Sequence, residues 1–358
     1  MSGYVDVYVE LCAYFSLVCT YVHVQVTSAS CGKSHTLFVV DFNEAFGLGS
    51  NKFGQLGTGR VLSAKSKQVK DAALGEVCAA PVKAVIDTNV TGPITSVICG
   101  ADFSMWLSQK GALFTAGMPQ YGVLGHGTDH EHNTSHASVK IAYEPQPVPK
   151  KVQFRSFLGD DEGTDPDALK IVKAAASNVH AACIDERGRL WTWGCGDYGR
   201  LGHGEQKDEF RPRVVKMFMG RMAIPIPEKH EDIGLCCGAS WTNVVGPMGQ
   251  LYQFGKLKHG GDSNMRPTPC MDLSGWNIRR MASGAQINVV GADESVIAWG
   301  TSNGFGELGY GPPPKPRSSV NPKKVDSLEG YKLVDCAAGY VHLQLFTCRY
   351  TCVYTSPC

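Results

Sequence analysis

A repeated glycine pattern restricts this chain to a small set of folds. An apolar or aromatic residue with a Gly, a short polar turn, and then Gly-x-Leu-Gly occur together four times along the 358 residues. The turns end in Gly54–Gly57, Gly122–Gly125, Gly199–Gly202 and Gly306–Gly309, and a fifth copy keeps only Phe254-Gly255. Repeats of this kind indicate stacked structural units, because one unit cannot bury its apolar faces alone.

A second anchor residue precedes each copy at an almost constant distance, whereas the distance between copies varies widely. A fixed unit with variable connectors is typical of a modular repeat, because insertions are tolerated in surface loops. We expect these glycines to serve turns with positive φ and close backbone approach, and not ligand binding. The anchor pairs are Gly32 with Gly49, Gly100 with Gly117, Ser177 with Gly194, Gly238 with Gly255, and Gly284 with Gly300.

The third copy shows the secondary structure of a unit most clearly. An apolar run at 180–184 is followed by the turn Asp185–Gly188 and by Arg189–Trp193, in which Leu190 and Thr192 alternate with Trp191 and Trp193. This period of two predicts a β-hairpin. Units of about 40–60 residues with about four short strands each are typical of propeller blades. The fold class is therefore predicted to be all-β, a β-propeller.

The repeat divides the chain into five units and a fragment. The predicted propeller domain covers residues 31–346, with an atypical N-terminal segment at 1–30 and an atypical tail at 347–358. Five units and a fragment leave two alternatives open, a small closed ring or an open one. The predicted units cover 31–98, 99–126, 171–226, 233–273 and 278–330, and the fragment covers 333–346.

Composition excludes few functions but sets the context. With 34 Lys and Arg against 33 Asp and Glu, the net charge of +1 gives no overall attraction to nucleic acid or to a membrane surface. The apolar run Leu11–Val24 has no preceding Lys or Arg, so we expect blade strands or a divergent start rather than a signal peptide or membrane span. Most of the 14 Cys lie in apolar runs, which predicts reduced intracellular thiols.

Three stretches are more specific than the generic repeat. They are 198–216, 274–284 and 292–311, supported by 100–105 and 143–152. These stretches resemble the regulator of chromosome condensation (RCC) repeat family, and most of all its second branch, the regulator of chromosome condensation two or telophase disc proteins. The resemblance covers residues 31–346. The first one or two blades of that seven-bladed family have no counterpart here, and the last breaks off in an unrelated tail.

The resemblance implies a function in which no covalent bond is made or broken. The founding member of the family is a guanine-nucleotide exchange factor for the small GTPase Ran and docks on nucleosomes, and the second branch is associated with chromosomes, the spindle and Rac-type or Ral-type GTPases. It thus implies a non-enzyme with a small GTPase partner of Ran, Rac or Ral type, chromatin or microtubules as further partners, and a location at chromosomes in the nucleus and in the cytoplasm. The competing interpretation is a scaffold propeller with no exchange activity.

Two segments supply candidate partner-binding residues. The long polar connector after the second unit contains Val148, Lys150 and Lys151, which position and resemblance suggest as an exchange wedge. The charged loop after the third repeat is either a solvated blade edge or a partner contact, because such loops gather on one face of a propeller. Its candidate residues are Glu205, Lys207, Asp208, Glu209 and Arg211.

The histidines favour structural roles over metal binding. His35, His180 and His342 follow their anchors at the same distance in different units, which predicts a repeated hydrogen bond. The cluster His126, His130, His132 and His136 lies among loop-forming residues and is a weak zinc candidate. The literal Gly-x-Gly-x-x-Gly at 194–199 lacks a βαβ context. We expect no cofactor, no small-molecule substrate and no membrane partner.

Overall fold

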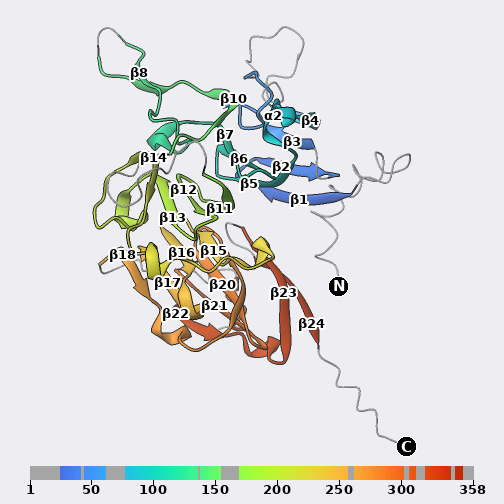
Figure 1. The fold of residues 1–358 in the computed structure, drawn as a ribbon, viewed down its shortest axis with the longest axis vertical. Helices are drawn as coiled ribbons and strands as arrows, with labels where there is room; N and C mark the ends of the chain where they lie inside the picture. Colours follow the sequence, from blue (N-terminus) through green and yellow to red (C-terminus); the bar gives the residue numbers. More distant parts are fainter. Residues whose placement is uncertain are drawn as a thin grey trace, which may run out of the picture.

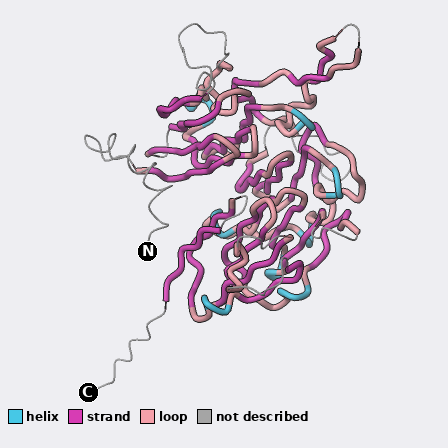
Figure 2. The backbone as a smooth tube through the Cα atoms, turned by 180° about the vertical axis from the view of Figure 1, so that it is seen from behind, coloured by secondary structure: helices cyan, strands magenta, loops and turns pink. Residues whose placement is uncertain are grey.

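The computed structural model describes residues 25–41, 44–61, 77–135, 138–154, 169–256, 262–301, 306–311, 319–339 and 343–349. In these residues nearly all regular structure is β-strand, with short helical turns between the strands (Figure 2). Five antiparallel sheets have four strands each, and two further sheets have two strands. The all-β propeller prediction is therefore confirmed.

Each four-stranded sheet is one blade, and its strands follow one another across the sheet in chain order. Blade 1 consists of β1 (Val26–Cys31), β2 (His35–Val40), β3 (Glu44–Ser50) and β4 (Val77–Lys83). Blade 2 consists of β5 (Ile94–Cys99), β6 (Phe103–Ser108), β7 (Leu113–Gly117) and β10 (Gln146–Lys151). Blade 3 consists of β11 (Ile171–Ala176), β12 (His180–Asp185), β13 (Leu190–Gly194) and β14 (Glu209–Val214).

The C-terminal half repeats this arrangement. Blade 4 consists of β15 (Leu235–Cys237), β16 (Trp241–Val245), β17 (Leu251–Gly255) and β18 (Asn264–Pro269). Blade 5 consists of β19 (Ile278–Ser283), β20 (Ile287–Ala292), β21 (Ser295–Gly300) and β22 (Ser319–Lys324), and a two-stranded sheet of β23 (Tyr331–Ala338) and β24 (Leu343–Arg349) follows. The hairpin β8 (Glu131–Asn133) and β9 (Ile141–Tyr143) forms a sheet of its own.

In the residues that the structure describes, the helical segments are single turns in the connectors. The α-helical turn is α2 (Thr88–Thr91). The 3-10 turns are η1 (Gln120–Gly122), η3 (Asp197–Gly199), η4 (Gly220–Met222), η5 (His230–Asp232), η6 (Pro247–Gly249), η7 (Met271–Leu273) and η8 (Asp326–Leu328).

The core lies between the blades. Every hydrophobic cluster joins two neighbours in the series, from blade 1 with blade 2 to blade 5 with β23. The inner strands of successive blades contact one another, in the order β1, β5, β11, β15, β19 and β23. No blade could bury these side chains alone, which explains why the repeat must be stacked.

In blades 1, 2 and 3 the Gly-x-Leu-Gly turn packs against the outer strand of the next blade, whereas an added Cβ on Gly306 of blade 5 would meet nothing within 4 Å. Its leucine is fully buried in all four copies, and the N–H of its second glycine donates to the carbonyl of the first, 2.9 Å in Gly199–Gly202. Both glycines have positive φ, 72° at Gly199 and 76° at Gly202. A Cβ on Gly199 would lie 2.7 Å from the Cα of Met265, in the outer strand of blade 4. The repeated glycines are therefore needed for both backbone conformation and blade contact.

The outer strands also share a proline. Pro81, Pro149, Pro212, Pro267 and Pro322 each stand third from the end of their strand. The pairing register shifts in all five outer strands. Proline lacks the N–H that a further strand would bind, so these edges are protected against pairing with another chain.

The described blades form an arc whose two ends lie on the same side of the molecule (Figure 1). In the described residues, β23 and β24 form their own sheet, and no C-terminal strand enters the sheet of β1. Of the two alternatives from the sequence, this part of the chain adopts the open one. The expected boundaries at 30 and 346 fall inside strands, since β1 begins at Val26 and β24 ends at Arg349.

The second unit differs most from its expected range of 99–126. Its sheet begins at Ile94 and ends at Lys151. The long connector thus returns to the blade as its outer strand, after forming the β8–β9 hairpin. Val148, expected in the connector, thus lies in the outer strand β10, whose residues Gln146, Lys150 and Lys151 pair with β7.

Candidate functional site

One face of the arc carries the connectors between the third and fourth strands of the blades. Because each blade is an antiparallel meander, the connector from its third to its fourth strand leaves on the same face as the hairpin between its first two strands. We call this side the connector face. It holds the segment Cys195–Asp208 of blade 3 and the β8–β9 hairpin of blade 2, which we call the arm. Three of the candidate residues from the sequence, Glu205, Lys207 and Asp208, lie in this segment of blade 3.

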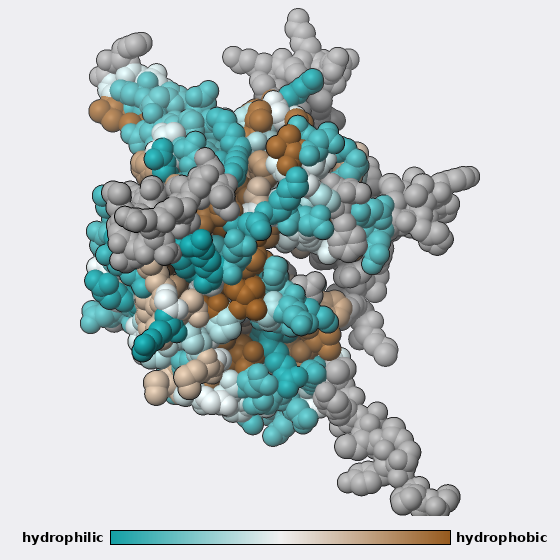
Figure 3. Space-filling view, in the orientation of Figure 1, coloured by the Kyte–Doolittle hydropathy of each residue, from teal (hydrophilic) through white to brown (hydrophobic). Residues whose placement is uncertain are grey.

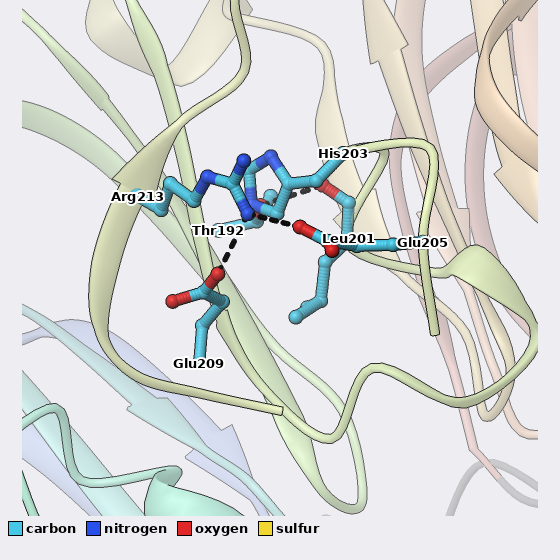
Figure 4. A network of polar contacts seen from close by, with 6 residues as sticks. All are labelled: Thr192, Leu201, His203, Glu205, Glu209 and Arg213. Atoms are coloured by element: carbon cyan, nitrogen blue, oxygen red, sulfur yellow. Dashed lines mark hydrogen bonds and ion pairs between the residues drawn. The ribbon is translucent and has the colours of Figure 1, made fainter. Parts of the chain in front are cut away.

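An ion-pair network fixes the blade 3 connector (Figure 4). Nη1 of Arg213 lies 2.5 Å from Oε1 of Glu205 and 2.8 Å from Oε1 of Glu209. Glu209 is only 3% exposed, and the hydrogen bond from Arg213, with its positive charge, lowers the pKa of the exposed Glu205 carboxyl. Two of the candidate partner residues, Glu205 and Glu209, are thereby engaged within the blade and shape the loop.

A threonine and a histidine close the same loop from within. Oγ1 of Thr192 donates to the carbonyl of Leu201 at 2.7 Å and lies 3.0 Å from Nε2 of His203 (Figure 4). Blade 2 repeats this arrangement with Thr115, at 2.6 Å from the carbonyl of Leu124 and 2.9 Å from Nε2 of His126. Burial lowers the pKa of His126 to about 4, so this ring is neutral near pH 7. The arrangement makes the loop rigid.

The exposed part of this connector presents an aromatic ring and positive charge. Asp208 accepts a hydrogen bond from the N–H of Gly196 at 2.8 Å, whereas Lys207 is exposed. Tyr198 is 41% exposed and has a φ of 61°, and the Nζ of Lys256 lies 4.9 Å from its ring centroid. Sequence reasoning missed Tyr198. The available signal was the aromatic residue before the first glycine of the turn, which recurs as Phe53 and Tyr121.

The arm stands away from the blades near β10 (Figure 1). Its strands pair from Glu131 with Tyr143 to Asn133 with Ile141. Val139 is 83% exposed and Ile141 is 44% exposed, so the arm presents apolar side chains to solvent. Figure 3 shows that the surface in this view is otherwise mainly hydrophilic, with the hydrophobic residues in separate patches. An exposed apolar hairpin on a rigid scaffold is typical of a contact element for another protein.

The remaining candidates lie on the circumference. Val148, Lys150 and Lys151 belong to the outer strand β10, and Arg211 belongs to the outer strand β14. All four are exposed. They are therefore separate from the segment Cys195–Asp208 of the connector face. The structure does not bring them together with Lys207 and Asp208 in one site.

The equivalent histidines connect neighbouring blades. Nε2 of His35 lies 2.9 Å from the hydroxyl of Ser104, and Nε2 of His180 lies 2.9 Å from the hydroxyl of Thr242. His342 lies outside the described residues. Burial lowers the pKa of His35 to about 4. The corresponding position of blade 4 is Trp241, whose Nε1 donates to Oδ1 of Asn288 at 2.8 Å, a link that the sequence did not reveal.

The histidine cluster of the long connector is dispersed. His126 faces Thr115, His130 lies in a turn with a φ of 52°, and His132 lies in β8. His136 lies outside the described residues. In the part of the chain that the structure describes, no three metal-binding side chains come together. No helix in that part is long and apolar enough to cross a membrane.

Comparison with known proteins supports the repeat assignment. Residues 43–107, 187–242 and 293–343 match the family model of the regulator of chromosome condensation (RCC1) repeat. The chain is 37% identical over 323 residues to Protein RCC2 of Mus musculus and to that of Homo sapiens. The alignment covers 89% of this chain and 57% of the mouse protein. The chain thus spans little more than half the length of these relatives.

Solved structures show the same fold. Human WBSCR16 superimposes with a TM-score of 0.70 at 20% identity, covering 92% of this chain and 73% of that one. Prp20p of Saccharomyces cerevisiae, described with its binding properties to Gsp1p and histones, gives a TM-score of 0.62 at 18% identity over 89% of this chain and 69% of that one. The fold, the repeats and the similarity to RCC2 agree: the chain belongs to the regulator of chromosome condensation (RCC1) repeat family.

Proposed function

We propose that the chain is a non-hydrolytic regulator of a small GTPase of Ran, Rac or Ral type, which it binds through the connector face and the arm. The observation that carries the proposal is the projecting β8–β9 hairpin with its exposed Val139 and Ile141, held by a rigid blade. Membership of the RCC1-repeat family and the binding of Prp20p to Gsp1p support this class of partner.

Exchange requires differential binding rather than bond chemistry. A factor that binds the nucleotide-free GTPase more tightly than the nucleotide-bound form lowers the affinity of the GTPase for nucleotide by the same factor. The arm supplies apolar side chains that can enter a partner surface. Lys256 supplies a cation over the ring of Tyr198, and Lys207 is an exposed cation of the same connector as Tyr198. Both cations are suited to carboxylates exposed when Mg²⁺ leaves. The rigid network around Arg213 limits the entropy lost on binding.

Chromatin or microtubules are the further partners that we propose, with the chain located at chromosomes in the nucleus and in the cytoplasm. The histone binding of Prp20p supports chromatin as a class of partner. A scaffold that binds the GTPase without accelerating nucleotide release is the alternative that the experiments must separate.

The proposal is tested by measuring binding to Ran, Rac and Ral in nucleotide-free and GDP-bound forms with biolayer interferometry. We expect tighter binding to the nucleotide-free form of one GTPase, and a loss of about tenfold or more for V139D/I141D, because exposed interface apolar residues are replaced by charges. The matched control is V85D/V90D, which alters two exposed valines outside the arm, 58% and 70% exposed. Equal affinities for both forms, or equal losses in both variants, would refute the proposal.

A further inference from the structure

The outer strands of the five blades carry most of the positive charge found in the strands. Together they contain eight basic residues and one acidic residue, Glu209. The second and third strands of the same blades contain no Lys or Arg. We call these eight residues the basic rim: Lys83, Lys150, Lys151, Arg211, Arg213, Arg266, Lys323 and Lys324.

This concentration contrasts with the nearly neutral chain, whose formal net charge is +1. Seven members of the basic rim are exposed, and Arg213 is partly exposed. The single acidic residue on these strands is 3% exposed and bound by Arg213, so it adds no negative charge to the surface. The repeat therefore places like charges at corresponding positions around the circumference, including the pairs Lys150-Lys151 and Lys323-Lys324.

Three residues in the middle of the basic rim, Lys150, Arg211 and Arg266, differ from its ends in their contacts. Lys83 pairs with Glu44, and Lys323 and Lys324 lie over the rings of Tyr310 and Trp276. In contrast, no carboxylate of the described residues forms an ion pair with Lys150, Arg211 or Arg266, which lie on blades 2, 3 and 4. Lys150 and Arg211 donate instead to the neutral side chains of Gln146 and Gln153, at 3.3 Å in both cases.

Arg211 and Arg266 are equivalent residues on adjacent blades. Arg211 packs over Gly127 of blade 2, and Arg266 packs over Gly204 of blade 3, where an added Cβ would lie 2.6 Å from each guanidinium group. These two glycines donate their N–H groups to the carbonyls of Phe210 and Met265 at 2.8 Å. The same blade-to-blade contact therefore presents an arginine at each junction.

We propose that the basic rim over blades 2 to 4 binds a flexible acidic polypeptide rich in Asp and Glu. The charge requires an anionic partner. The convex circumference disfavours duplex DNA, whose persistence length of about 150 bp makes bending around a small protein costly. Exposed aromatic platforms for single-stranded nucleic acid are scarce on these strands, where Phe210 is 37% exposed. Because each outer strand contains a proline and a register shift, recognition relies on side chains and not on strand addition.

The test is fluorescence anisotropy of the full chain with three labelled probes of matched length: an oligoglutamate, a duplex DNA and an oligo-dT. We expect the oligoglutamate to bind most tightly, with an affinity that falls as salt increases. The variant K150E/R211E/R266E should weaken it about tenfold or more, which corresponds to about 1.4 kcal/mol. The control K33E/R221E/K229E makes the same change in net charge at exposed residues outside the outer strands.

Equal losses in the two variants would mean nonspecific attraction and would overturn the proposal. Tighter binding of either nucleic acid, lost in K150E/R211E/R266E, would replace the acidic polypeptide by nucleic acid. Circular dichroism checks that both variants are folded, and the neutral variant K150Q/R211Q/R266Q should show a smaller loss in the same direction. Neither result depends on the GTPase proposal, because the arm is unchanged in all these variants.

Discussion

Nε2 of His180 in blade 3 lies 2.9 Å from the hydroxyl oxygen of Thr242 in blade 4, and both side chains are fully buried. The preceding junction has no such bond, since Phe103 of blade 2 and Ala181 of blade 3 take the two corresponding positions and share one hydrophobic cluster. Neighbouring blades are thus matched chemically, either by a polar pair or by an apolar one. A mismatch at one junction should destabilise the arc.

The matching predicts a non-additive pair of substitutions. His180→Phe and Thr242→Ala should each lower the free energy of unfolding by about 1–3 kcal/mol, because each breaks the buried bond between the two blades. Thr242→Ala leaves Nε2 of His180 without a partner, whereas in His180→Phe the Thr242 hydroxyl keeps only its bond to the carbonyl of Arg200. The double variant reproduces the Phe-Ala pair of the preceding junction and should be more stable than the sum of the single effects predicts. Urea unfolding followed by tryptophan fluorescence measures all three. Strict additivity would contradict the account of blade matching.

Buried histidines predict a loss of stability in acid. Burial lowers the pKa of His35 to about 4, whereas an unfolded histidine has a pKa of about 6.5. The folded state therefore binds fewer protons, and the stability from neutral His35 is present above pH 6.5 and lost as pH falls toward 4, by about 3 kcal/mol at most. His35→Asn should be less stable than the parent at pH 7.5.

The pH dependence of this difference is the informative measurement. Urea midpoints of the parent and of His35→Asn should approach each other between pH 6.5 and pH 4. In this range His35 is neutral in the folded parent and binds a proton when the chain unfolds, whereas Asn binds none. The exposed His132 provides the control, because His132→Asn should leave the midpoint unchanged. A parent-to-variant difference that stays constant across this range would show that His35 does not titrate as described.

A buried carboxylate holds the hairpin of blade 3. Asp185 is fully buried and accepts hydrogen bonds from Nε of Arg189 at 2.7 Å and from Nε1 of Trp191 at 2.9 Å. Asp185→Ala should cost about 3–5 kcal/mol of unfolding free energy, because the Arg189 guanidinium stays buried without its anion. Asp185→Ala/Arg189→Met removes both charges and should recover part of the loss in thermal denaturation. A double variant less stable than Asp185→Ala would contradict this explanation.

Two glycines allow the cost of a positive φ to be compared with the cost of steric overlap between an added Cβ and a neighbouring blade. Gly199 and Gly275 both have positive φ, 72° and 82°, but an added Cβ meets the backbone of Met265 only at Gly199. Gly275→Ala should cost about 1 kcal/mol from the left-handed conformation alone. Gly199→Ala should cost clearly more, since blades 3 and 4 must separate. Calorimetric unfolding of the two variants checks this order, and equal losses would refute the role of the turn in blade contact.

Local sequence patterns predicted the hairpins of the blades. They could not predict which residues pair when they are far apart in the chain. The hairpin of β12 and β13 follows the alternation around Trp191 and the turn before Gly188, both of which are short-range signals. The outer strand β10 was missed because the arm separates it from β7 and because Pro149 is unusual in a strand. The bond between Trp241 and Asn288 joins two blades, so no spacing within one unit reveals it.

The candidate site was predicted only in part for the same reason. Charge identified the segment 205–211, but it could not show that Arg213 binds Glu205 and Glu209 while Arg211 turns to the circumference. The basic pairs 150–151 and 323–324 lie far apart in the sequence. They occupy corresponding places only once the strand order is known.

The rate of GDP release from Ran, Rac and Ral, followed with a fluorescent GDP analogue in the presence of the purified chain, tests the central proposal most directly. The account predicts at least about tenfold acceleration for one of the three GTPases, abolished by V139D/I141D and retained by V85D/V90D. Release at the intrinsic rate for all three would contradict exchange and leave a scaffold, and acceleration that survives V139D/I141D would contradict the role of the arm.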